Sequence, residues 1–174
     1  MNESAIIAAD TDVTVGGALT LNEASSFATS GAGEVTITGG AALSGTSATI
    51  ETSGTLNLGA PAAIAGKTLN VVGGGKINAT GLTTGGVTSI DFSNGTTLKT
   101  AAFDDTGATL STVNLTGNGT LAIDAALTGA ITAGDTTFHI ATDAMLSTVQ
   151  PPNGPMGTSQ TSLVLEGGTF FVTG

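Results

Sequence analysis

Two seven-residue stretches near the middle of the chain decide its fold: Val87-Thr-Ser-Ile-Asp-Phe-Ser93 and Leu110-Ser-Thr-Val-Asn-Leu-Thr116. A third stretch of this kind, Asp135-Thr-Thr-Phe-His-Ile-Ala141, follows at a similar distance along the chain. In each stretch apolar and polar residues alternate, which is the period of a half-buried β-strand. Short strands that return at a nearly fixed spacing predict a chain built from stacked repeats.

The same pattern extends along most of the chain as a triple of apolar residues at positions i, i+2 and i+8. Successive triples begin at similar distances from one another, except for one much shorter step from Val35 to Ala48. This spacing favours an all-β solenoid of stacked coils of about 21–25 residues, with a β-sandwich or jelly roll as the alternative. The eight triples are Val13/Val15/Leu21, Val35/Ile37/Leu43, Ala48/Ile50/Leu56, Leu69/Val71/Ile77, Ile90/Phe92/Leu98, Val113/Leu115/Leu121, Phe138/Ile140/Leu146 and Leu163/Leu165/Phe171.

The solenoid prediction covers residues 1–174 as a single domain. The step from Val35 to Ala48 is too short for a coil, and Leu56/Leu58/Ile64 also fits the triple, so we expect an irregular coil near residues 43–69. Residues 149–157 hold three of the four prolines and are expected to form a long Pro/Gly loop. The apolar run at 170–174 has no polar cap, which suggests a fragment of a longer array or a chain whose ends pair with neighbouring copies.

The composition narrows the classes of function. Thr, Gly and Ala supply 85 of the 174 residues, and the chain has no Cys, Trp or Tyr. The formal charge of −10, with only three basic residues, argues against nucleic-acid binding, which needs a basic surface. Apolar runs are too short for a transmembrane helix, so no membrane insertion is expected. The absence of Cys excludes disulfides and thiol catalysis.

The stretches Val87–Leu98 and Thr109–Leu121 resemble the repeats of bacterial surface-layer and related secreted β-solenoid proteins. These proteins share the excess of Thr, Gly and Ala and the acidic composition. The second stretch also resembles, more weakly, bacterial leucine-rich repeats, with Asn118 at the Asn position of their motif. The resemblance implies an extracellular, cell-surface protein. Surface-layer solenoids commonly use Ca²⁺ through Gly-Gly-x-Gly-x-Asp nonapeptides, which this chain lacks.

The lone histidine is the first candidate for a metal site. If His139 points outward, equivalent positions of the repeat place Asp91 and Asn114 on neighbouring rungs, about 4.8 Å apart. A metal could bind such a group, but a solvated polar ladder is the favoured interpretation.

Other candidates have equally plain interpretations. Asp104 and Asp105, expected in a loop, and the pair Asp10 and Asp12 could bind Ca²⁺, but no spaced carboxylate motif is present and acidic corners are favoured. Gly73–Gly75 opens no helix and is expected to be a corner rather than a phosphate loop. No catalytic, cofactor-binding or metal-binding residue is therefore predicted, and Ca²⁺ is left open without a recognisable motif.

Together these features predict a non-enzymatic structural module of an extracellular surface layer, filament or adhesin stalk. It would self-associate with neighbouring copies through exposed β-edges and solenoid ends. A phage tail-fibre or adhesin tip domain that binds surface glycan through residues 149–157 is the second hypothesis. A solenoid polysaccharide-degrading enzyme is the third. The lack of Arg, Trp and Tyr disfavours it, since such enzymes need cations and aromatic platforms for sugar rings.

Overall fold

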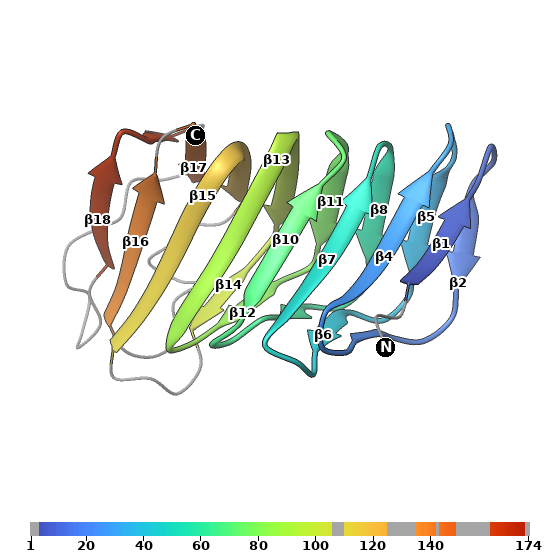
Figure 1. The fold of residues 1–174 in the computed structure, drawn as a ribbon, viewed down its shortest axis with the longest axis horizontal. Helices are drawn as coiled ribbons and strands as arrows, with labels where there is room; N and C mark the ends of the chain where they lie inside the picture. The colour runs from blue at the N-terminus through green and yellow to red at the C-terminus, as the bar shows by residue number, and fades with distance from the viewer. Residues whose placement is uncertain (1–3, 106–109, 125–134, 142, 149–160, 173–174) are drawn as a thin grey trace.

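The computed structural model describes residues 4–105, 110–124, 135–141, 143–148 and 161–172 (Figure 1). Every helix or strand in these ranges is a β-strand, and each strand pairs with its neighbours in parallel. The strands stack side by side into a β-solenoid (Figure 1). The predicted all-β solenoid is confirmed, and parallel pairing excludes the antiparallel sandwich or jelly roll. The loop expected at 149–157 lies outside the described residues.

Each coil runs along up to three faces of the solenoid, and strands of neighbouring coils lie next to each other on each face. The first face holds β1 (Ser4–Ala8), β4 (Ser25–Ser30), β7 (Ser47–Thr52), β10 (Thr68–Val72), the first parts of β13 (Val87–Thr100) and β15 (Leu110–Ile123), β16 (Asp135–Ala141) and β18 (Thr161–Glu166). The second face holds β2 (Val13–Val15), β5 (Glu34–Ile37), β8 (Thr55–Leu58), β11 (Lys76–Ala79), the second parts of β13 and β15, β17 (Ala144–Thr148) and β19 (Thr169–Val172). The third face holds β3 (Leu19–Leu21), β6 (Ala41–Leu43), β9 (Ala62–Ala63), β12 (Leu82–Thr84) and β14 (Phe103–Asp105).

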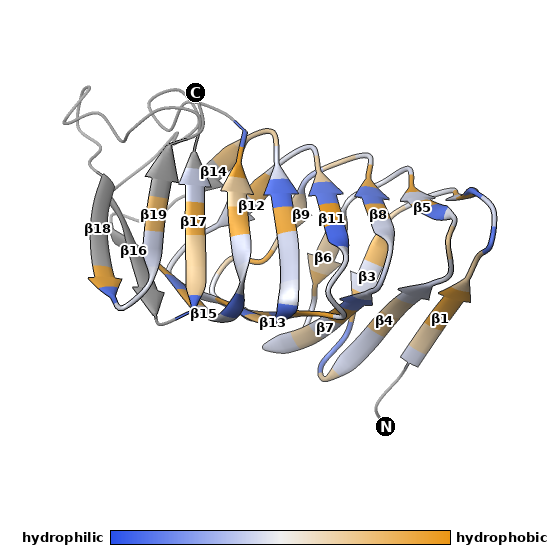
Figure 2. Ribbon diagram, turned by 90° about the horizontal axis from the view of Figure 1, so that it is seen from above, coloured by the Kyte–Doolittle hydropathy of each residue, from blue (hydrophilic) through white to orange (hydrophobic). Residues whose placement is uncertain are grey.

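The core is made of columns in which inward side chains of successive coils lie on one another. On the second face Val35, Leu56, Ile77 and Leu98 pair in this order along β5, β8, β11 and β13, and each is at most 1 % exposed. Bands of apolar residues consequently cross neighbouring strands in Figure 2. The alternation of the sequence therefore sets which side chains enter the core, and stacking buries them.

The short step of the repeat, between Val35 and Ala48, has a simple origin. The first two triples follow the second and third faces, whereas the triple at Ala48 starts on the first face, where Ala48 pairs with Leu69. Residues 43–69, where we expected an irregular coil, contain β7, β8 and β9, which pair with both neighbouring coils in continuous register. The short step therefore arises because the apolar triple is read from a different starting face at Ala48. Pairs of inward residues two apart occur on every face, so the pattern does not distinguish one face from another.

The central repeat is offset by two residues from its predicted alignment. Ile90 pairs with Leu115 rather than with Val113, whereas Leu98 pairs with Leu121 as the sequence predicts. The register shifts between Phe92 and Thr96, because the corner of β13 holds two residues more than the corresponding corner of β15. Paired positions of these two coils are therefore farther apart in the sequence on the first face than on the second.

The last triple also needs a correction, by one residue. Leu146 pairs with Phe170 and not with Phe171, and Phe170 packs against the core. Two consecutive phenylalanines fit the apolar pattern equally well, so the sequence could not decide between them. The described part of the chain has no helix that is long and apolar enough to span a membrane.

Glycine allows the corners to approach one another closely. Gly73, between β10 and β11, has a φ of +104°, and a Cβ atom there would lie 2.5 Å from the carbonyl oxygen of Thr52 in the preceding coil. A side chain would be strained by the backbone and would collide with that carbonyl. Gly73–Gly75 thus form a corner, as expected.

Buried threonine hydroxyls hold two other corners. The hydroxyl of Thr96 accepts a hydrogen bond from the Gly74 amide of the preceding coil at 2.8 Å and donates to the Ser93 carbonyl at 2.7 Å. Thr88 repeats this arrangement with the Gly66 amide at 3.0 Å and the Gly85 carbonyl at 3.1 Å. These hydroxyls satisfy polar backbone groups at turns where the sheet cannot do so.

Truncating a side chain in a core column should strongly lower the stability of the protein. Leu98→Ala should lower the free energy of unfolding by about 2–5 kcal/mol, because it leaves a cavity in a column that is closed on both sides. Thr97→Ala, on the outward side of the same strand, is the matched control and should cost much less. Chemical denaturation followed by circular dichroism measures both, and equal losses would contradict the assignment of the faces.

The corner threonines give a second, sharper comparison. Thr96→Val keeps the shape but removes both corner hydrogen bonds, and should cost about 1–3 kcal/mol. Thr84 is equally buried, but its hydroxyl has no hydrogen-bond partner in the described structure. Thr84→Val should therefore be neutral or stabilising. The same denaturation experiment decides, and a larger loss for Thr84→Val would refute this account of the corners.

Candidate functional site

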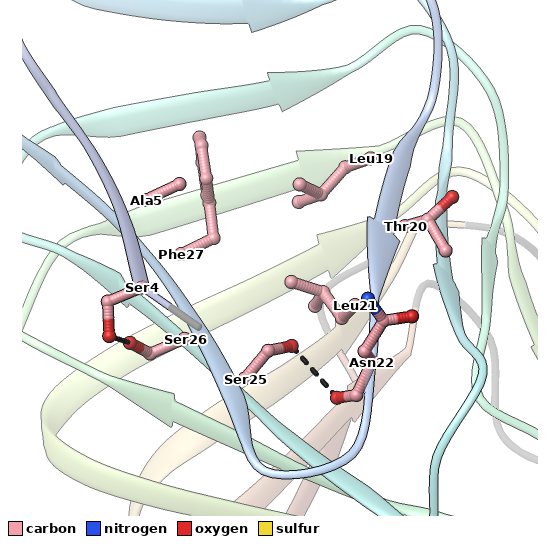
Figure 3. A pocket seen from close by; sticks show the side chains of 9 residues that line it. All are labelled: Ser4, Ala5, Leu19, Thr20, Leu21, Asn22, Ser25, Ser26 and Phe27. Carbon is pink, nitrogen blue, oxygen red and sulfur yellow. Dashed lines mark hydrogen bonds between the residues drawn. The ribbon is translucent and has the colours of Figure 1, made fainter. Parts of the chain in front are cut away.

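The first coil leaves an opening into the core at the N-terminal end of the stack. A cavity of about 260 Å³ lies there between β1, β3 and β4 (Figure 3). We call it the N-terminal opening. Its lining residues are Ser4, Ala5, Leu19, Thr20, Leu21, Asn22, Ser25, Ser26 and Phe27.

The N-terminal opening has an apolar floor and a hydroxyl-rich rim. Phe27 and Leu21 are buried, Leu19 is half-buried and Ala5 is exposed, as expected where the columns lose their next coil. None of its lining residues is titratable. The cavity thus suits an apolar side chain or segment, and its lining supplies no group for acid–base catalysis.

The polar groups of the rim are largely bonded to one another (Figure 3). The Ser26 hydroxyl donates to the Ser4 hydroxyl oxygen at 2.8 Å, and the Ser25 hydroxyl donates to the Asn22 carbonyl at 2.8 Å. The side-chain oxygen of Asn22 also accepts from the Ser44 hydroxyl at 2.8 Å. Ser4 is the member of the Ser4/Ser26 pair that lies at the open end of the first coil.

The strands of the first coil are edges within the described structure. β1 pairs with β4, β2 with β5 and β3 with β6, each on one side. Ile7, Val13, Val15 and Leu19 point to the core but are only partly buried, and Ile6 on the outside is 72 % exposed. Such an edge offers both backbone groups and apolar surface to an added strand.

A charged corner adjoins this end. Glu23 follows β3, and its carboxylate accepts hydrogen bonds from the Thr46 hydroxyl, at 2.7 Å, and from the Thr46 amide. These bonds, the one from the hydroxyl foremost, hold the pKa of the Glu23 carboxyl below its ordinary value of 4.5, because they stabilise the charged form. Stabilisation by this group is present above its ordinary pKa and is lost as the pH falls through the lowered one.

This corner predicts a specific acid response. Thr46→Ala should raise the pKa of the Glu23 carboxyl toward 4.5, as measured by NMR titration. The wild type should also lose more thermal stability than Glu23→Gln when the pH is lowered from neutral to below 4, since only the wild type has this carboxylate to protonate. An unchanged Glu23 titration in Thr46→Ala would contradict the assignment.

A polar ladder lies outside the second face. The Asn78 side-chain amide donates to the Asn57 side-chain oxygen at 2.8 Å, and Asn57 donates to Glu34 and, at 3.5 Å, to Thr36. Lys99 follows in the same column and pairs with Asp124 at 3.0 Å. A shallow groove of about 340 Å³ beside the ladder is lined by Thr36, Asn57, Leu58, Gly59, Asn78, Ala79, Thr80 and Ala101. The amides largely satisfy one another, so the ladder supports the face and leaves few polar groups for a ligand.

The ladder predicted around His139 is arranged differently. Asp91 pairs with Thr116, while Asn114 pairs with Ser89 and with His139. Asp91 and His139 therefore lie in different columns, as the two-residue offset of β15 requires. The side chain of His139 lies outside the described residues. The Thr116 hydroxyl donates to the Asp91 carboxylate, which shows a bonded polar column where Asp91 lies.

The two acidic pairs, Asp104/Asp105 and Asp10/Asp12, lie in different coils. Asp104 and Asp105 belong to β14 and pair with β12, which corrects their expected place in a loop. Their side chains lie outside the described residues. Asp12 accepts a hydrogen bond from the Glu34 amide at 3.0 Å, and Asp10 is exposed at the same corner. Among described residues, no three His, Asp or Glu side chains gather as a metal site would require.

None of the family models, curated proteins or solved structures compared with this chain matches it. The sequence predicted association through exposed β-edges and solenoid ends and pointed to the uncapped end at 170–174, but it did not indicate the N-terminal opening. The signal was present in Ala5 and Ile7, which alternate in the strand period ahead of the first triple.

Proposed function

We propose that this chain is a non-enzymatic structural module of an extracellular surface layer, filament or adhesin stalk. Its role is mechanical: stacked coils make a stiff rod, and the exposed edges and ends of the rod join subunits. The observation that carries the proposal is the N-terminal opening, where edge strands and a partly exposed apolar core meet.

Two further features support it. The core columns continue without a break from coil to coil, so a load along the rod is shared by parallel backbone pairing on each face. The opening is lined by apolar, hydroxyl and amide groups, which favours packing over chemistry. The extracellular location is part of this proposal and rests on the compositional resemblance to secreted solenoids.

Assembly is the property to measure. Purified protein should form filaments or sheets in electron microscopy, and its sedimentation should become faster as its concentration rises. Assembly should also be stronger at about 0.1 M salt than at about 0.01 M, because the Debye length falls from about 30 Å to about 10 Å and copies with a charge of −10 repel each other less.

The competing functions give different results in parallel assays. A dispersed monomer at high concentration would contradict the structural role. Binding on a glycan array without assembly would favour the tip-domain hypothesis. Release of reducing ends from acidic polysaccharides would favour the enzyme hypothesis.

A further inference from the structure

Within the described residues, the two ends of the solenoid partly expose the same core column of the second face. One column of the second face runs from Val13 on β2 to Phe170 on β19. Its six inner members, each at most 1 % exposed, are Val35, Leu56, Ile77, Leu98, Leu121 and Leu146. Val13 and Phe170, at opposite ends, are half-buried. Among the described residues, each end member thus lacks one of the two neighbours that every inner member has.

The first face also leaves apolar side chains exposed at its ends. Leu165 on β18 follows Leu115 and Ile90 in a core column, yet it is 56 % exposed whereas they are fully buried. At the other end, Ala5 and Ile7 of β1 face the core beside the N-terminal opening. Apolar surface is therefore present at both ends of the first face, but in different columns. The column of Leu165 runs back to Ser25 on β4, whereas the column of Ala5 runs to Phe92 on β13.

Side-chain hydrogen bonds between neighbouring coils on the outside of the first face run from a donor on the later coil to an acceptor on the earlier coil. In one outward column, Ser26 donates to Ser4, Asn70 donates to Thr49 at 3.4 Å, and Thr116 donates to Asp91. In each pair the later coil donates to the earlier one. Ser4 begins this column within the described residues, and its exposed hydroxyl is free in geometry to donate to a coil placed before it. Continuing the register of β15, β16 and β18 places Glu166 in the same column at the other end.

We propose that the N-terminal end of one copy binds the C-terminal end of a second copy, with β18 and β19 adding in parallel to β1 and β2. In this register Glu166 of one copy accepts from Ser4 of the next, and Phe170 lies on Val13. The inference rests on the proposed structural function and names the partner and geometry of the joint. It continues the coil-to-coil interface that the chain already makes within itself.

Such a joint uses different surfaces on the two copies. A head-to-tail contact of this kind does not close on itself when its operation is a translation along the rod, so it generates a filament. Parallel pairing across the joint also satisfies edge groups of β1 and β2 that no described strand bonds.

The absence of native cysteine makes a direct test possible. Neighbouring strands are about 4.8 Å apart, which lies within the range of Cα distances of about 4.4–6.8 Å that a disulfide bridges. In the variant Ser4→Cys/Glu166→Cys, mild oxidation should link copies into a ladder of multimers that collapses on reduction. The matched control, Ser4→Cys/Ser162→Cys, moves one thiol four residues along β18, about 13 Å away, and should give no ladder.

The outcomes of this experiment distinguish a failure of the proposed joint from a failure of the proposed structural role. A ladder with position 166 but not with 162 supports the joint. Equal ladders from both variants, or none, overturn it, and if filaments still form by electron microscopy the structural role stands with another interface. Linked dimers without longer multimers would indicate a contact that closes between two copies, and would overturn the head-to-tail joint.

A charge placed in the joint offers a second readout. Val13→Lys should abolish assembly of the full chain while the circular dichroism spectrum is unchanged, because the lysine would be buried against Phe170 of the next copy. Thr14→Lys, on the outward side of the same strand, is the control and should still assemble. Assembly of Val13→Lys at the wild-type level would overturn the proposed joint.

Discussion

Each coil of this chain can bury its apolar side chains only against the coils before and after it. A single coil consists of a few short strands and has no second layer to cover their inward side chains. Leu56, Ile77 and Leu98 are therefore buried only because each packs against the corresponding residue of the neighbouring coils. Parallel pairing keeps like positions adjacent, which is why outward residues form ladders as well. Glycine corners and buried threonines are the local means by which the backbone turns without interrupting these columns.

The same constraint gives the ends their chemistry. Where stacking stops, side chains with inward positions are left partly in water, as Val13 and Leu165 are. Backbone groups of β1 also have no described strand beside them on one side. The strands at such an end have the same spacing of inward residues and the same chain direction as a further coil would have. The lining of the N-terminal opening contains no titratable group. These features are the reason we propose that the ends associate with further coils.

Much of this fold could be predicted from the sequence, because alternation identifies strands and glycine identifies corners. The face on which each strand lies could not be predicted. Apolar pairs such as Val35/Ile37 and Ala48/Ile50 have the same sequence pattern although they lie on different faces. The offset at Leu115 depends on corner length, which an apolar pattern does not record. The apolar pattern also does not identify Thr96 as a buried residue, because it is buried at a tight corner that needs its hydroxyl. The N-terminal opening was missed because partial burial depends on what lies next to a strand.

The corner between the two parts of β13 shows where the molecule tolerates a change of length. Asn94 and Gly95 are the two additional residues there, both with positive φ and exposed, and a Cβ on Gly95 would meet no atom within 4 Å. The strands on either side nevertheless keep their pairing with β15. Insertions at this position would project into solvent and leave the core untouched. The rod can therefore carry cargo, such as a grafted peptide epitope, at a defined height along its axis.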